Sequence, residues 1–172
     1  GTHTDISDRK FAEIQLAVQN TLLAKIAQGQ PLTDVLNALI EMVEHHSDGV
    51  LCSVLLLDQD NRFRPGAAPS LPSDYNQALE GLQIGEGVGS CGTAAFRNET
   101  VISADLATDP LWCRCNELAL RYGLRACWSS PITARGGKVL GTFTMYYRQV
   151  RSPQPHELQT ITQMAHIAGI AI

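Results

Sequence analysis

ACWSSPITARGGKVLGTFTMYY, residues 126–147, predicts a β-hairpin. Two strand-like runs, 126–134 and 139–147, flank Arg135-Gly136-Gly137-Lys138, and paired glycines between such runs are typical of a tight turn. In the second run the two alternating sets of side chains are Val139, Phe143, Met145 and Tyr147 against Leu140, Thr142, Thr144 and Tyr146. The first set is the more apolar, as expected of a strand that packs a core on one face. Strands joined by such a turn are antiparallel, so the sequence predicts an antiparallel sheet.

The surrounding sequence adds a second hairpin and several helices. Runs 50–57 and 63–67 flank the turn signal at residues 58–61, and residues 100–103 form a brief further strand candidate. Apolar periodicity predicts helices over 9–29, over 32–46 and from Pro153 onward, with short helices near 75–79 and 93–97 and an irregular excursion over 109–122. This order of elements predicts an α+β fold whose long helices pack together on one face of the sheet.

Composition predicts one folded domain. The 172 residues are 44% hydrophobic and 17% charged, with a net charge of −4 and scattered basic residues, which disfavours a nucleic-acid-binding surface. No apolar run is long enough to span a membrane, and no signal peptide is recognisable. Five cysteines, an odd number, then predict reduced thiols in a cytoplasmic protein.

The two terminal segments predict contacts beyond this domain. Residues 1–8 are expected to be a tail and residues 9–172 the domain. The helix over 9–29 carries two apolar sides, with one stripe at Phe11, Ile14, Val18, Leu22 and Ile26 and a second at Leu16, Leu23 and Ala27. One side is expected to cover the domain and the other to meet a partner helix. The helix over 153–172 is still apolar at Ile172 and has no cap, so it is expected to continue into an attached module.

Several segments in order resemble the GAF domain family. They are IGEGVGSCGTAA at 84–95, VISAD at 101–105, DPLW at 109–112, GLRACWSSPI at 123–132, VLGTF at 139–143 and the closing PQPHEL at 153–158. The resemblance covers residues 32–172 and is strongest to GAF domains found beside PAS, GGDEF, EAL or histidine-kinase modules in bacterial signalling proteins. It implies a six-stranded antiparallel sheet, helices on one face, a ligand pocket on the other face under the excursion, and homodimerisation through the terminal helices.

The glycine-rich segment 85–92 lacks both nucleotide-binding spacings. It has no Gly-Lys-Ser/Thr ending and no G-x-G-x-x-G between a strand and a helix, so its glycines are expected to permit a tight turn. The alternative is that backbone N–H groups near Ser90 and Cys91 hold an anionic part of a ligand.

The cysteines carry three alternatives. Cys113 and Cys115 lie two apart beside Trp112, and the GAF layout implies that Cys91 and Cys127 face the same cavity. The C-x-C spacing is poor for zinc, so no metal site is assigned, leaving a thiol redox switch or ordinary buried thiols. The free methionine sulfoxide reductases are GAF-fold enzymes with cysteines near this loop. Cys91 lies in the comparable loop, but residues 68–84 lack the upstream cysteine of that family.

The sequence lacks the residues that bind the cofactors known from GAF domains. No histidine lies between residues 47 and 155, which disfavours haem, and no Cys-His pair is present, which disfavours a bilin. The cofactor therefore stays unassigned. Asp105, Trp112, Arg125 and Trp128 complete the candidate pocket residues, with Arg125 suited to an anion. Alternatively Arg125 pairs with Asp105 and both tryptophans belong to the core.

The sequence as a whole predicts a sensory domain of a larger signalling protein. It is expected to bind an unidentified small molecule or to respond to redox conditions, and to pass the signal through its terminal helices to a covalently linked output domain. The alternatives are a thiol-dependent enzyme like the free methionine sulfoxide reductases and a dimerisation module that binds no ligand.

Overall fold

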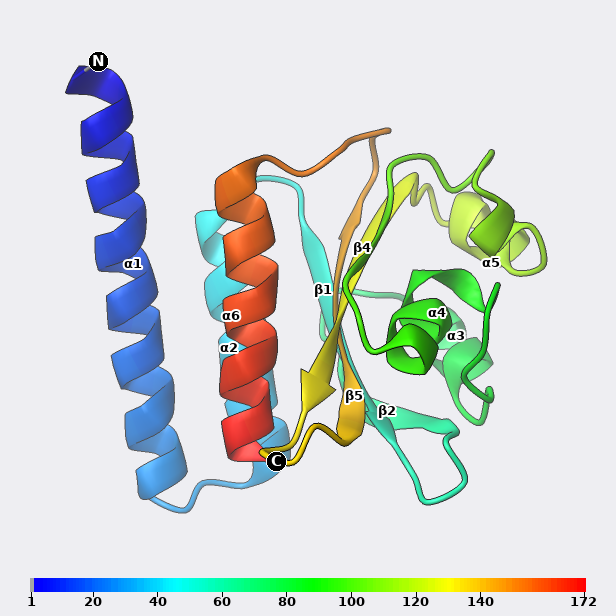
Figure 1. Ribbon diagram of the computed structural model, residues 1–172, viewed down its shortest axis with the longest axis horizontal. Coiled ribbons are helices and arrows are strands. Elements are labelled where there is room, and N and C mark those ends of the chain that lie inside the picture. Colours follow the sequence, from blue (N-terminus) through cyan, green and yellow to red (C-terminus); the bar gives the residue numbers. More distant parts are fainter. Residues whose placement is uncertain (1) are drawn as a thin grey trace.

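The computed structural model describes residues 2–172, with the side chains of residues 2–11, 14, 15 and 18 left aside. Its centre is an antiparallel sheet of five strands in the order β2-β1-β5-β4-β3 (Figure 1). The strands are β1 Leu51–Leu57, β2 Phe63–Ala67, β3 Val101–Ser103, β4 Ala126–Thr133 and β5 Val139–Tyr147. Both hairpins predicted from the sequence are confirmed, and the β4–β5 hairpin lies at the middle of the sheet.

The expectation of six strands is wrong for this chain. Residues 81–84 run beside β2, where the Gly81 amide donates to the Phe63 carbonyl and the Phe63 amide donates to the Leu82 carbonyl. The only β-pairing there is an isolated bridge between Arg62 and Gln83. Gly81 has a φ of 83°, which breaks the extended backbone, so this segment makes a partial edge rather than a sixth strand.

Three long helices cover one face of the sheet. They are α1 Thr2–Ala27, α2 Leu32–His46 and α6 Pro155–Ala171. Helices α2 and α6 lie on the sheet, and α1 packs against both of them from outside (Figure 1). Helix α1 begins at Thr2 and so includes residues 2–8. No helix among residues 2–172 is both long and apolar enough to cross a membrane.

The two predicted stripes of α1 have different surroundings. Leu22 is fully buried, whereas Leu16 is 59% exposed. Phe11, Ile14 and Val18 lie outside the described side chains. The described part of α1 therefore has one buried side and a large apolar side chain, Leu16, in solvent.

The opposite face carries the short elements of the excursion. These are α3 Ser73–Leu79, α4 Gly89–Arg97, the 3-10 turn η1 Pro110–Trp112 and α5 Asn116–Arg121. They lie on the side of the sheet away from α1, α2 and α6 (Figure 1). The molecule thus has two apolar cores, one under the long helices and one under the excursion.

Strand alternation on β5 divides these cores. Phe143, Met145 and Tyr147 face the long helices, and Thr144 and Tyr146 face the excursion. The predicted apolar set therefore faces the helices, with one correction. Val139 packs with the excursion-side core and Leu140 with the helix-side core, because β5 has an extra residue where Thr133 pairs with Val139 and Ile132 with Gly141.

Candidate functional site: a cavity floored by a buried thiol

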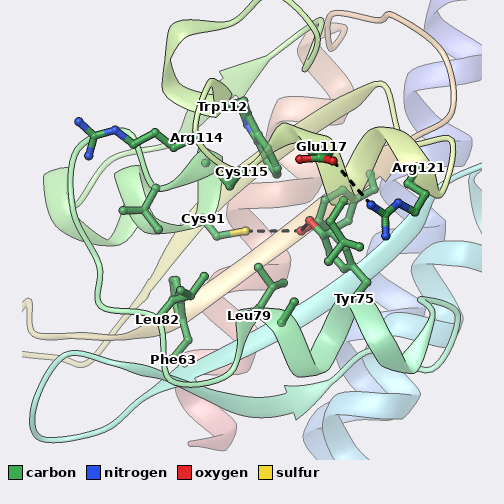
Figure 2. A pocket seen from close by; sticks show the side chains of 15 residues that line it. Phe63, Tyr75, Leu79, Leu82, Cys91, Trp112, Arg114, Cys115, Glu117 and Arg121 are labelled. Atoms are coloured by element: carbon green, nitrogen blue, oxygen red, sulfur yellow. Dashed lines mark hydrogen bonds and ion pairs between the residues drawn. The ribbon is translucent and has the colours of Figure 1, made fainter.

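A cavity of about 370 Å³ lies between the sheet and the excursion. Apolar groups from β2, α3, α4 and η1 form most of its wall, and charged side chains of the segment 114–121 stand at its edge (Figure 2). Its lining consists of Phe63, Tyr75, Ala78, Leu79, Leu82, Val88, Gly89, Cys91, Trp112, Arg114, Cys115, Glu117, Leu118, Arg121 and Tyr146. Pockets of about 300–1,000 Å³ with such a lining are typical of small-molecule sites.

Hydroxyl groups from the sheet surround the Cys91 thiol in the cavity floor. The Cys91 Sγ lies 3.2 Å from Thr144 Oγ1, 3.4 Å from Ser129 Oγ and 3.8 Å from the Tyr146 hydroxyl. Ser129 and Thr144 are register partners on β4 and β5, and their hydroxyl oxygens are 2.9 Å apart. Because Tyr75 donates its own proton to the Tyr146 hydroxyl at 2.9 Å, the Tyr146 proton is available for Cys91.

These contacts lower the pKa of Cys91 from its ordinary value of 9.0 to about 6. The hydrogen bond from the Cys127 thiol is the largest cause, and the hydroxyls of Ser129, Thr144 and Tyr146 add to it against the effect of burial. For Cys127, burial and the neighbouring Cys91 raise the pKa well above its ordinary value. The pair therefore consists of a thiolate that accepts and a thiol that donates at neutral pH.

Trp112 forms one wall and is fixed by a short hydrogen-bond chain. Its indole Nε1–H donates to Ser90 Oγ at 2.8 Å, and the Ser90 hydroxyl donates to the Cys127 carbonyl at 3.0 Å. Gly89 lies directly beneath the indole ring, where a Cβ would be 3.2 Å from a ring carbon, and its φ is 62°. The glycine-rich segment therefore serves as a turn that brings α4 and Trp112 together, and α4 begins at Gly89 rather than at residue 93.

The edge of the cavity carries charge. Arg114, Glu117 and Arg121 are exposed, and Arg121 lies 3.7 Å from Glu117 (Figure 2). Cys115 is partly buried on the same wall, and burial raises its pKa to about 11, with the neighbouring Cys91 as a second cause. A neutral Cys115 thiol and an ionised Cys91 thiol thus share one cavity.

Six of the nine residues predicted for the pocket do not line it: Ser90, Asp105, Cys113, Arg125, Cys127 and Trp128. Trp128 faces the long helices and donates its indole N–H to the Arg151 carbonyl at 3.2 Å. The prediction that Cys127 and Trp128 share the cavity is wrong, because consecutive strand residues point to opposite faces. Arg125 pairs with Asp105 at 3.4 Å, away from the lining residues, as the alternative interpretation proposed. Cys113 is exposed on the surface.

The remaining predicted residues do come together. Cys91, Trp112 and Cys115 line the cavity, and Ser90 and Cys127 support it from behind. Ser129 and Thr144 were not among the predicted pocket residues, although Thr144 and Tyr146 lie on the more polar face of the predicted strand at residues 139–147. Tyr75 was not predicted either, because the short helix that carries it contains no distinguishing motif. Among residues 2–172, no group of three or more His, Cys, Asp or Glu residues is arranged to hold a metal ion.

Comparison with known proteins identifies the family to which this fold belongs. A sequence model of the GAF domain family matches residues 29–172. The chain belongs to the GAF domain family. This GAF domain is 43% identical over 173 residues to the methyl sulfide methyltransferase-associated sensor of Methanosarcina acetivorans, and the match covers 100% of this chain but 17% of that protein.

Solved structures agree on the fold of this GAF domain. The GAF domain of a phosphoenolpyruvate-protein phosphotransferase from Coxiella burnetii matches with a TM-score of 0.73 and 21% identity, covering 91% of this chain and 92% of that one. The reduced fRMsr of Staphylococcus aureus matches with a TM-score of 0.71 and 16% identity, covering 91% and 93%. At these identities the likeness extends to the fold alone.

Proposed function

We propose that this GAF domain is the sensory unit of a larger signalling protein and binds a small, mainly apolar molecule in the cavity beside Cys91. The observation that carries the proposal is the cavity itself, which combines an apolar wall with a hydrogen-bonded thiol in its floor. Its volume of about 370 Å³ is more than twice the ~150 Å³ that suffices for benzene in an engineered cavity, so it fits a molecule of one or two rings or an equivalent aliphatic group.

The charged edge narrows the class of ligand. The charged lining residues are Arg114, Arg121 and Glu117, which gives one positive charge in excess. A ligand with an apolar body and an anionic or polar end would place its body against Phe63 and Leu79 and its end near Arg114.

Signal transmission is proposed to use the terminal helices. A ligand shifts the domain only by binding one conformation better than another, so the roof formed by η1 and α5 and the sheet beneath it must differ between states. Helix α6 packs on β4 and β5, the strands that carry Cys127 and Tyr146. The exposed apolar side chains Leu16 and Ile170 suit a homodimer through α1 and α6, and an output domain in a cytoplasmic protein is proposed to follow.

The sensor assignment draws on the relative as well. The matching protein is named a sensor, and this chain spans 17% of its length. The chain therefore corresponds to one module of a much longer protein in that relative, which supports a regulatory role here.

A thermal-shift screen of small apolar acids, alcohols and sulfur compounds tests ligand binding. A compound at 100 times its Kd stabilises the folded state by about 2.7 kcal/mol. The variant Ala78→Trp fills the cavity and should abolish the shift, whereas Ala24→Trp, on the exposed side of α1, should preserve it. Equal shifts in both variants would place the binding elsewhere, and a domain that binds nothing would leave the dimerisation module as its role.

A thiol-dependent reductase is the second candidate. It is favoured by the position of Cys91 and Cys115 in one cavity and by the fold shared with fRMsr of Staphylococcus aureus. Such an enzyme would turn over free methionine sulfoxide with a thiol reductant, and Cys91→Ser would abolish the turnover. The sensor proposal predicts no turnover by the unaltered domain.

A further inference from the structure

Two of the five cysteines lie close together beneath the cavity, in the same buried cluster. Cys91 lies on α4 and Cys127 on β4. Ser129 bridges the pair, with its hydroxyl 3.4 Å from the Cys91 Sγ and 3.8 Å from the Cys127 Sγ. The Ser90 hydroxyl holds the first turn of α4 to the Cys127 carbonyl. Both thiols are free in the structure.

Access to this pair is one-sided. Cys91 lines the cavity, whereas Cys127 is fully buried behind it and does not line the cavity. A small reagent in the cavity therefore reaches Cys91 first. Cys127 is positioned to react only with the oxidised form of Cys91. The other cysteine of the cavity, Cys115, keeps its proton at neutral pH because burial raises its pKa to about 11.

We propose that Cys91 and Cys127 are a hydroperoxide-responsive dithiol pair, in which Cys91 reacts with a hydroperoxide in the cavity and Cys127 then closes a disulfide with it. The inference rests on the proposed sensory function and names one input to the same cavity. The Cys91 thiolate attacks the terminal oxygen of the hydroperoxide, the O–O bond breaks, and the sulfur becomes a sulfenic acid. The leaving alkoxide or hydroxide takes up the proton that Cys91 had released.

The second step consumes the neighbouring thiol. The Cys127 sulfur attacks the Cys91 sulfur, the S–S bond forms, and the hydroxide that leaves combines with the Cys127 proton to give water. Two thiols are oxidised by two electrons in total and one hydroperoxide is reduced to an alcohol or water. Because the S–S length is about 2.05 Å and both thiols are free in the structure, the two sulfur atoms must approach, and the hydrogen bonds of the Cys91 Sγ to Thr144 and Tyr146 are then expected to break. Ser90, which accepts the hydrogen bond from the Trp112 indole, lies next to Cys91 in the first turn of α4.

Peptide mapping of the unaltered domain tests this pairing without a variant. An arginine separates each successive pair among Cys91, Cys113, Cys115 and Cys127, so trypsin places each of these on its own peptide. After treatment with hydrogen peroxide or tert-butyl hydroperoxide, we expect a loss of about 2 Da, corresponding to two hydrogens, and a cross-link between the Cys91 and Cys127 peptides. The reaction should be several-fold faster at pH 7 than at pH 5.

Three variants define the order of the steps. In Cys127→Ser and Cys127→Ala, dimedone should trap a sulfenic acid at Cys91, and in Cys91→Ser the buried Cys127 should stay reduced. The surface variant Cys113→Ser is the matched control and should form the Cys91–Cys127 link at the unaltered rate. A dominant link from Cys91 to Cys115, or no oxidation at Cys91, would overturn the inference.

The same samples separate this inference from ligand binding. If compounds still stabilise the domain in the thermal-shift screen but no Cys91–Cys127 link forms, the dithiol pair is wrong and the ligand proposal stands. If the link forms and no compound binds, the ligand proposal fails and the redox input remains.

Discussion

The reaction of Cys91 with an alkylating reagent should titrate far below that of an ordinary cysteine. The perturbation is pH, and the structural cause is the set of hydrogen bonds to the Cys91 Sγ from Cys127, Ser129, Thr144 and Tyr146. With a pKa of about 6 instead of 9.0, the thiolate fraction at pH 7 rises from about 1% to about 90%.

The gain in rate is much smaller than this change in thiolate fraction. Thiolate nucleophilicity falls with pKa with a slope of about 0.4–0.5, so a shift of about three units lowers the intrinsic rate roughly 20-fold. The net advantage of Cys91 at pH 7 is therefore only about 4-fold, before any slowing by burial. Restricted access of the reagent to the cavity slows the reaction at every pH and leaves the midpoint unchanged. The midpoint, not the speed, is the quantity to measure.

The assay treats the folded domain with iodoacetamide from pH 4.5 to 9.5 and quantifies alkylation of the Cys91 peptide by mass spectrometry. We expect a midpoint near pH 6, and a higher midpoint in Ser129→Ala, which removes one of the hydroxyl donors. A midpoint at or above pH 8.5 for Cys91 would refute the reasoning, because the thiol would then react only as an unperturbed or unfolded cysteine does.

The same shift links Cys91 to stability. Its folded pKa lies below its unfolded value, so its contribution is fully present above about pH 9 and is lost as the pH falls through about 6. The free energy of unfolding of the unaltered domain, relative to Cys91→Ser, should therefore rise between pH 6 and 9, by at most about 4 kcal/mol. A difference that is flat across this range contradicts the ionised state of Cys91.

Two further predictions concern folding. Gly92→Ala should lower the free energy of unfolding by about 1–3 kcal/mol in urea titrations, because its Cβ would lie 2.5 Å from the Val88 Cβ. The control Gly136→Ala should leave this free energy nearly unchanged, because a Cβ at Gly136 meets nothing within 4 Å. Equal losses in the two variants would mean that the α4 turn is not tightly packed. Glu157→Gln should lower the free energy of unfolding by about 1–3 kcal/mol and with it the thermal midpoint, because the buried Glu157 carboxylate lies 2.8 Å from the Arg151 guanidinium. An unchanged midpoint would show that this ion pair does not hold α6 to the sheet.

The hairpins were predictable because their turns depend on local chemistry. The glycines after Ala134 permit the β4–β5 turn, where Gly137 has a φ of 93°. At the β1–β2 turn, Asn61 has a φ of 58° and the Asp58 carboxylate accepts hydrogen bonds from the amides of Asp60 and Arg62. Such features need no knowledge of distant contacts.

The site was predicted less completely because it depends on which face each residue takes. Alternation along the β4 run would have separated Cys127 from Trp128, since consecutive strand residues cannot both face the cavity. The contact of Cys91 with Ser129 and Thr144 depends on where α4 sits over the sheet, which the local pattern does not contain. Likewise, the sixth strand implied by the family was replaced by a single bridge at Gln83, whose neighbour Gly81 interrupts the extended backbone.

The central claim is that the cavity on the face away from the long helices is the ligand site, and the indole N–H resonances test it directly. The chain has two tryptophans, with Trp112 in the cavity wall and Trp128 on the opposite face of the sheet. In ¹H–¹⁵N spectra of the domain titrated with a compound from the thermal-shift screen, we expect the Trp112 resonance to shift and saturate while the Trp128 resonance stays in place. A shift confined to Trp128, or a stabilising compound that moves neither resonance, would contradict it.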